Sequence, residues 1–85
     1  MPSVEIYTKS WCGFCQAAKR LLTQKGVAFT EYDVEKDRAR LPEMIDRAHG
    51  RRTVPQIFIG TTHVGGCDDL FALNGEGKLD ALLAS

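Results

Sequence analysis

The sequence is poor in cysteine, carries no net charge and lacks the pattern of a leader segment. Three cysteines in 85 residues are too few for a disulfide-rich secreted scaffold, and an odd number leaves one unpaired. The formal net charge is zero, and acidic and basic residues are interspersed apart from the short stretch Arg51-Arg52, so we expect no nucleic-acid or membrane partner. No charged segment followed by an apolar run precedes Val4. We therefore expect a cytoplasmic protein with one domain over residues 1–85.

Hydrophobic periodicity predicts an α/β chain. Strands are expected over 4–8, over 27–34 and in a hairpin of 56–59 and 63–65; helices are expected over about 13–25, 37–48, 68–73 and 79–83. Gly26 and Gly50 follow the first two helices, and Pro42 falls in the first turns of the second. The order predicts a four-stranded mixed sheet flanked by helices, with the first two strands parallel and the hairpin strands antiparallel to them. This is a thioredoxin-like topology.

Two cysteines stand where the first strand gives way to the first helix. A helix that begins at Cys12 directs free backbone N–H groups and the positive end of its dipole at the sulfur. We expect Cys12 to be an exposed nucleophile with a pKa lowered to roughly 3.5–7.5. Cys15 lies one turn later, within disulfide reach and less accessible, which suits a resolving thiol. Cys67 follows two glycines and is expected to be a packed, inert thiol.

Four ordered blocks of the sequence resemble the glutaredoxins, most closely the small bacterial ones. They are Val4-Glu5-Ile6-Tyr7-Thr8-Lys9, the Cys12/Cys15 motif, Thr53-Val54-Pro55-Gln56-Ile57-Phe58-Ile59 and Gly65-Gly66-Cys67-Asp68-Asp69-Leu70. The resemblance implies a glutathione-dependent thiol–disulfide oxidoreductase that reduces protein–glutathione mixed disulfides and other disulfides. It also implies a cis peptide bond before Pro55, facing the cysteines.

The resemblance and the chemistry of glutathione together indicate a binding groove. Glutathione is an extended peptide with two carboxylates and one amine, and the Thr53-Val54-Pro55 backbone can pair with it as an added strand. Lys9 and Gln56 are expected at the glycyl carboxylate. The N–H groups of Cys67 and Asp68 suit the γ-glutamyl carboxylate, and the Asp68 side chain suits the amine. Phe14 would border the groove, Gly65-Gly66 would allow close approach of the ligand, and Arg51 is expected on a solvated face.

The motif Cys-Gly-Phe-Cys departs from the commoner dithiol motif Cys-Pro-Tyr-Cys and leaves alternatives open. Its Gly13-Phe14 pair resembles that of the monothiol Cys-Gly-Phe-Ser glutaredoxins, which bind iron–sulfur clusters with glutathione. The expected monomer would then become a dimer in which Cys12 ligates a bridging [2Fe-2S] cluster. A zinc site of Cys12, Cys15, His63 and Cys67 and a flavoenzyme-driven thioredoxin-type reductase are weaker alternatives.

Overall fold

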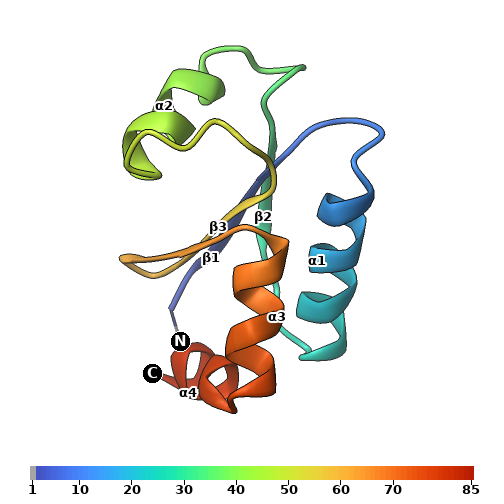
Figure 1. Ribbon diagram of the computed structural model, residues 1–85, viewed down its shortest axis with the longest axis vertical. Helices are drawn as coiled ribbons and strands as arrows, with labels where there is room; N and C mark the ends of the chain where they lie inside the picture. Colours follow the sequence, from blue (N-terminus) through green and yellow to red (C-terminus); the bar gives the residue numbers. More distant parts are fainter. Residues whose placement is uncertain (1) are drawn as a thin grey trace.

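The computed structural model describes residues 2–85, which form a four-stranded sheet with helices on both faces (Figure 1). The strands are β1 (Val4–Thr8), β2 (Thr30–Asp33), β3 (Gln56–Ile59) and β4 (Thr62–Gly65). The helices are α1 (Gly13–Gln24), α2 (Arg40–Arg47), α3 (Cys67–Gly75) and α4 (Lys78–Ala84). The predicted thioredoxin-like fold and the predicted order of elements are confirmed.

The strand order is β2-β1-β3-β4, with β1 parallel to β2 and antiparallel to β3. The prediction was wrong for β4: it is antiparallel to β3, so it runs parallel to β1. The second strand also begins later than predicted, at Thr30 opposite Glu5. The Val27 N–H instead bonds the Leu22 carbonyl at 3.4 Å and closes the end of α1. The second helix begins at Arg40, later than predicted, because turns closed by the Asp37 and Arg38 carbonyls precede its regular hydrogen bonds.

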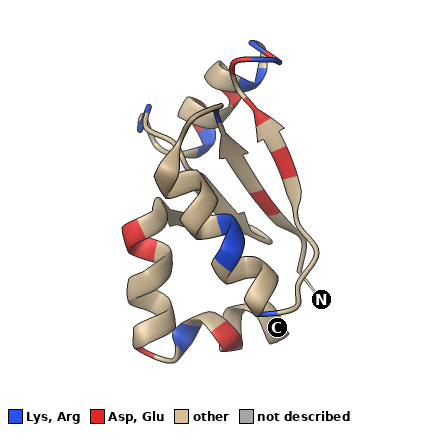
Figure 2. Ribbon diagram, turned by 90° about the vertical axis from the view of Figure 1, so that its right-hand side faces the viewer, with Lys and Arg blue, Asp and Glu red and all other residues tan. Residues whose placement is uncertain are grey.

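Alternating side chains give the sheet two cores. On one face Ile6, Ile57 and Ile59 pack with α1, α3 and α4. On the other face Tyr7 and Phe58 pack with Met44 and Ala48 from the α2 segment. Figure 1 shows α2 apart from α1 and α3, across the sheet. Figure 2 shows acidic and basic positions interspersed over several elements, in keeping with the zero net charge.

A polar network attaches α2 to the sheet. The Tyr7 hydroxyl donates to Glu43 Oε2 at 2.5 Å and accepts from Arg47 Nη1 at 2.8 Å. Arg47 also pairs with Glu5 on β1 at 3.0 Å. Burial, and then the bond to Glu43, raise the pKa of Tyr7 to about 12. Tyr7 therefore stays a neutral donor at neutral pH, and its hydroxyl joins two charged groups of α2.

We expect Tyr7→Phe to lower the free energy of unfolding by about 1–2 kcal/mol. The substitution keeps the buried ring but leaves Glu43 and Arg47 without a shared partner. The loss should stay moderate because Arg40 still bonds Glu43 and Glu5 still bonds Arg47. Urea denaturation measures it, with Tyr32→Phe as the control, since Tyr32 is half-buried and its hydroxyl has the single partner Glu5. A smaller loss for Tyr7→Phe than for Tyr32→Phe would contradict the importance of this network.

None of the helices within residues 2–85 is long and apolar enough to cross a lipid bilayer.

Candidate active site

Cys12 is the N-cap residue of α1. Its backbone is extended, at φ −105° and ψ 106°, so its sulfur turns back over the first turn of the helix. The Cys15 N–H donates to Cys12 Sγ at 3.1 Å, and the first turn holds no acidic side chain. A helix N-terminus and a directed N–H donor both favour negative charge on this sulfur. The arrangement is that of a nucleophilic thiol.

Cys12 is less accessible than predicted. It is 9% exposed, because its sulfur lies under the loop that carries Val54, 4.0 Å from the Val54 carbonyl oxygen. The apolar side chains beside it are the exposed ones: Trp11 lies fully in solvent and Phe14 is 63% exposed. A substrate sulfur can therefore reach Cys12 through a hollow that Phe14 and Val54 also line.

The other two cysteines are suited to secondary roles. Cys15 is 1% exposed. Its burial, and next its side-chain hydrogen bond with Cys12, raise the pKa of the Cys15 thiol to about 12. Cys15 is thus a protonated thiol beside Cys12, and the prediction that it is the less accessible of the two is confirmed. Burial, and then the Asp68 carboxylate, raise the pKa of Cys67, which disfavours the reactive thiolate there.

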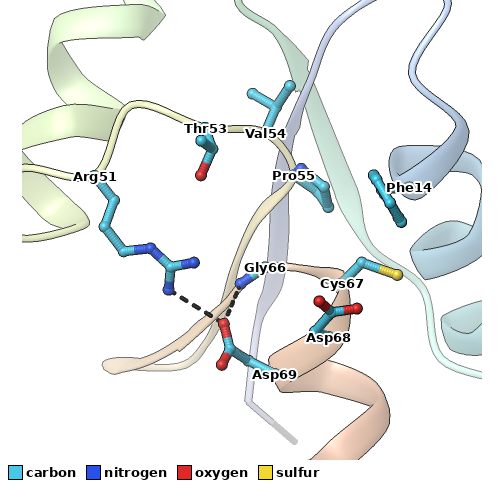
Figure 3. A pocket seen from close by; sticks show the side chains of 9 residues that line it. All are labelled: Phe14, Arg51, Thr53, Val54, Pro55, Gly66, Cys67, Asp68 and Asp69. Carbon is cyan, nitrogen blue, oxygen red and sulfur yellow. Dashed lines mark hydrogen bonds and ion pairs between the residues drawn. The ribbon is translucent and has the colours of Figure 1, made fainter.

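Seven of the predicted site residues line a single hollow of about 270 Å³ (Figure 3). They are Phe14, Thr53, Val54, Pro55, Gly66, Cys67 and Asp68. The Val54–Pro55 peptide bond is cis, as predicted. Because Cys67 and Asp68 form the first turn of α3, their N–H groups precede its internal hydrogen bonds, which begin with Leu70 N–H on the Gly66 carbonyl.

Two further residues, Arg51 and Asp69, complete this hollow. Arg51 is exposed, as predicted, and it also lines the hollow, where it pairs with Asp69 at 3.1 Å. Asp69 Oδ2 also accepts the Gly66 N–H at 2.8 Å, and this bond, with Arg51 second, lowers the pKa of Asp69. Asp69 stands three residues after the N-cap residue Gly66. An acidic residue at this position is typical of a helix start, so the sequence itself contained a signal for this cap.

Gly65-Gly66 were predicted to let a ligand approach the backbone closely. In the structure, side chains of the protein itself approach this closely, and they do so mainly at Gly65. Gly65 has φ +113°, whereas Gly66 is extended at φ −91° and ψ −167°. The Asp69 and Arg51 side chains occupy the space where a Cβ of Gly65 would lie. Glycine is therefore required at 65 by both backbone conformation and contact.

Lys9 and Cys12 line a second hollow that adjoins the first. The two hollows share Phe14, Thr53 and Val54, and Cys12 lines the second one, with its sulfur 4.0 Å from the Val54 carbonyl oxygen. Lys9 is exposed, and a charged group of a ligand can reach it from this side.

Gln56 does not lie where the prediction placed it. Its side chain is fully buried on the α2 face of the sheet, because residues 56 and 58 of β3 share that face while 57 and 59 face α1. Its Nε2 donates to the Thr53 carbonyl at 3.0 Å and to Thr53 Oγ1 at 3.3 Å. Both amide hydrogens are used, so this side chain has no donor left for a ligand carboxylate.

The zinc alternative is not supported by the geometry. Within residues 2–85 no three His, Cys, Asp or Glu side chains are grouped so that they could hold a metal ion. His63 instead lies 2.7 Å from the Gln56 side chain, and Cys15 points into the fold from within α1.

A thioredoxin-like fold with one cysteine that caps a helix, a buried second cysteine one turn later and a cis-proline loop beside them defines a thiol–disulfide oxidoreductase. Residues 4–64 match the family model described as Glutaredoxin. The chain is 55% identical over 83 residues to glutaredoxin 3 of Escherichia coli strain K12, which covers 98% of this chain and 99% of that protein. It belongs to the glutaredoxin family.

Solved structures agree with this assignment. A crystal structure of buckwheat glutaredoxin in complex with glutathione superposes with a TM-score of 0.88 at 30% identity, over 98% of this chain and 77% of that one. The solution structure of glutaredoxin from Brucella melitensis gives 0.84 at 54% identity, over 98% and 89%.

Proposed function

We propose that the protein is a glutathione-dependent oxidoreductase that reduces protein–glutathione mixed disulfides and small disulfides, with Cys12 as nucleophile and Cys15 as resolving thiol. The observation that carries the proposal is the groove: the Val54 backbone, the start of α3 and Cys12 lie around adjoining hollows. The buckwheat relative, with the same fold, forms a complex with glutathione.

The ligand would lie along the groove with its sulfur at Cys12. Its cysteinyl unit would pair with the Val54 backbone as a short added strand. The γ-glutamyl carboxylate would accept from the Cys67 and Asp68 N–H groups, and Asp68, which is exposed, would bind the amine. Lys9 would approach the glycyl carboxylate, while Gln56 contributes only indirectly.

In the first step the Cys12 thiolate attacks the glutathione sulfur of a mixed disulfide. A Cys12–glutathione disulfide forms, and the substrate leaves as a thiolate that takes up a proton. A second glutathione thiolate then attacks the glutathione sulfur on Cys12, giving glutathione disulfide and free Cys12. On the alternative route Cys15 loses its proton and attacks Cys12 Sγ, which releases glutathione and forms the Cys12–Cys15 disulfide for reduction by two further glutathiones.

A turnover assay with a glutathione mixed disulfide, coupled to glutathione reductase, tests this function. We expect turnover that depends on glutathione, with glutathione disulfide as product. Reduction supported equally well by an unrelated monothiol of similar pKa would contradict a glutathione-specific enzyme.

Asp68→Ala should weaken the use of glutathione mixed disulfides by about tenfold in kcat/KM, the scale of one charged hydrogen bond reduced by solvent exposure. Reduction of cystamine, a disulfide without the γ-glutamyl group, should change much less. The matched control is Asp80→Ala on α4, which removes an exposed carboxylate away from the groove. An unchanged preference between the two substrates would show that Asp68 serves only as an acidic residue at the start of α3.

The [2Fe-2S] alternative needs ligands from a second copy of the chain and from glutathione as well as Cys12. The Gly13-Phe14 pair of the motif is the feature that favours a cluster, and the geometry described for residues 2–85 adds no second observation to it. We therefore retain the disulfide chemistry alone.

A further inference from the structure

We infer that Gln56 and His63 are positioning residues for glutathione: together they set the direction of the Val54 N–H without touching the ligand. The inference rests on the proposed function. It starts from an uncharged polar side chain, Gln56, that is fully buried in a central strand although its neighbours in β3 are apolar. A buried amide costs free energy unless all its groups are bonded, so its partners define its role.

The amide of Gln56 bonds the residue before Val54. Nε2 donates to both the carbonyl and the hydroxyl oxygen of Thr53, at 3.0 and 3.3 Å. Thr53 is exposed and lines the groove (Figure 3). Its carbonyl is turned inward, because it accepts from the buried Gln56.

Planarity of the peptide group carries this constraint to Val54. The Thr53 carbonyl and the Val54 N–H belong to one trans peptide, so they point in opposite directions. With the carbonyl turned toward Gln56, the Val54 N–H must point away from the protein interior. No backbone hydrogen bond in the turns and loops of residues 2–85 uses this N–H, which is the donor that an added strand requires.

His63 fixes the orientation of the Gln56 amide. Because Nε2 of Gln56 is the atom that donates to Thr53, its Oε1 must be the atom that faces His63 Nε2, at 2.7 Å. The imidazole is held in place on β4 by stacking on Phe58, with ring centroids 4.9 Å apart. Without the His63 donor, the Gln56 amide could rotate by half a turn, so that its Oε1 would face the Thr53 carbonyl oxygen. Two acceptors repel each other, and the Thr53–Val54 peptide would turn over, so that the Val54 N–H would point inward, toward Gln56.

The test measures binding of S-methylglutathione, which cannot form a disulfide, by NMR titration of the otherwise native protein. We expect His63→Leu to raise Kd about fivefold and to shift the Val54 amide resonance, whereas His63→Gln, which retains a donor amide, should stay within about twofold of wild type. His49→Asn is the matched control: it removes the neighbouring imidazole, and asparagine tolerates the positive φ of 58° at this position. The rate at which Cys12 reacts with cystamine should be the same in all four proteins.

The outcomes separate the two proposals. If the wild-type protein fails to bind S-methylglutathione, the proposed function itself is overturned. If wild type binds and His63→Leu binds equally well, only the positioning role is overturned, as it is if His63→Gln is as defective as His63→Leu. Should His63→Leu fail to fold, Gln56→Met preserves the buried volume, removes the donors to Thr53 and must show the same loss of affinity.

Discussion

Cys12→Ser should lose glutathione-dependent turnover by at least about a thousandfold, while Cys15→Ser should retain activity within about tenfold of wild type on glutathione mixed disulfides. Cys12 is the thiol that caps α1, accepts a hydrogen bond from the Cys15 N–H and lines the second of the two adjoining hollows. A serine oxygen in its place cannot form the mixed disulfide. Cys15 is needed only on the route through an internal disulfide, because a second glutathione can release the first.

The coupled assay on the two variants measures this difference, with Cys67→Ser as the control. Cys67 lines the groove as a buried thiol whose raised pKa disfavours the thiolate, so its replacement should change turnover little. Equal losses in Cys12→Ser and Cys15→Ser would rule out the monothiol route. A collapse of activity in Cys67→Ser would show that this cysteine takes part in the chemistry.

Gly65→Ala should lower the free energy of unfolding by about 2–4 kcal/mol and weaken glutathione binding at the same time. The φ of +113° at this position is unfavourable for any residue with a side chain. The added Cβ would lie 2.8 Å from Arg51 Nη1 and 2.9 Å from Asp69 Cγ, distances that real Cβ atoms do not reach. Asp69 must then move and give up the Gly66 N–H, and the start of α3 loses its cap.

Urea denaturation and S-methylglutathione titration measure the two effects of Gly65→Ala. Gly75→Ala near the end of α3 is the control, because a Cβ there meets nothing within 4 Å. In that helical position alanine should leave binding unchanged and stability equal or up to about 1 kcal/mol higher. A Gly65→Ala protein as stable as Gly75→Ala would contradict the contact between β4 and the Asp69 cap.

Local patterns in the sequence were sufficient for most elements and for the position of Cys12 at the start of α1. The apolar run before the cysteines, the helical spacing after them and the glycine between two strand-like segments are properties of neighbouring residues, so they predict β1, α1 and the hairpin correctly. The proposed role of Cys12 as nucleophile rests on the same short range, since the end of a helix acts on the residue that caps it. The groove residues were predicted from resemblance to a family, and seven of them do line one hollow.

The sequence by itself determined the fold class and the position of Cys12 and Cys15 at the start of α1, because these depend on patterns of neighbouring residues. The cis-proline loop at Pro55 was predicted from the resemblance to a family, and the structure has it. The tertiary structure alone decided that the Gln56 side chain donates to Thr53 and that Arg51 pairs with Asp69. It also decided that Val54 covers Cys12 and that β4 runs parallel to β1. Arg51 and Asp69 are 18 residues apart and Cys12 and Val54 are 42 apart, so their contacts exist only once the sheet is assembled. The face on which Gln56 lies was fixed by the pairing register of β3, in which a shift of one residue would turn its side chain from the α2 face to the α1 face.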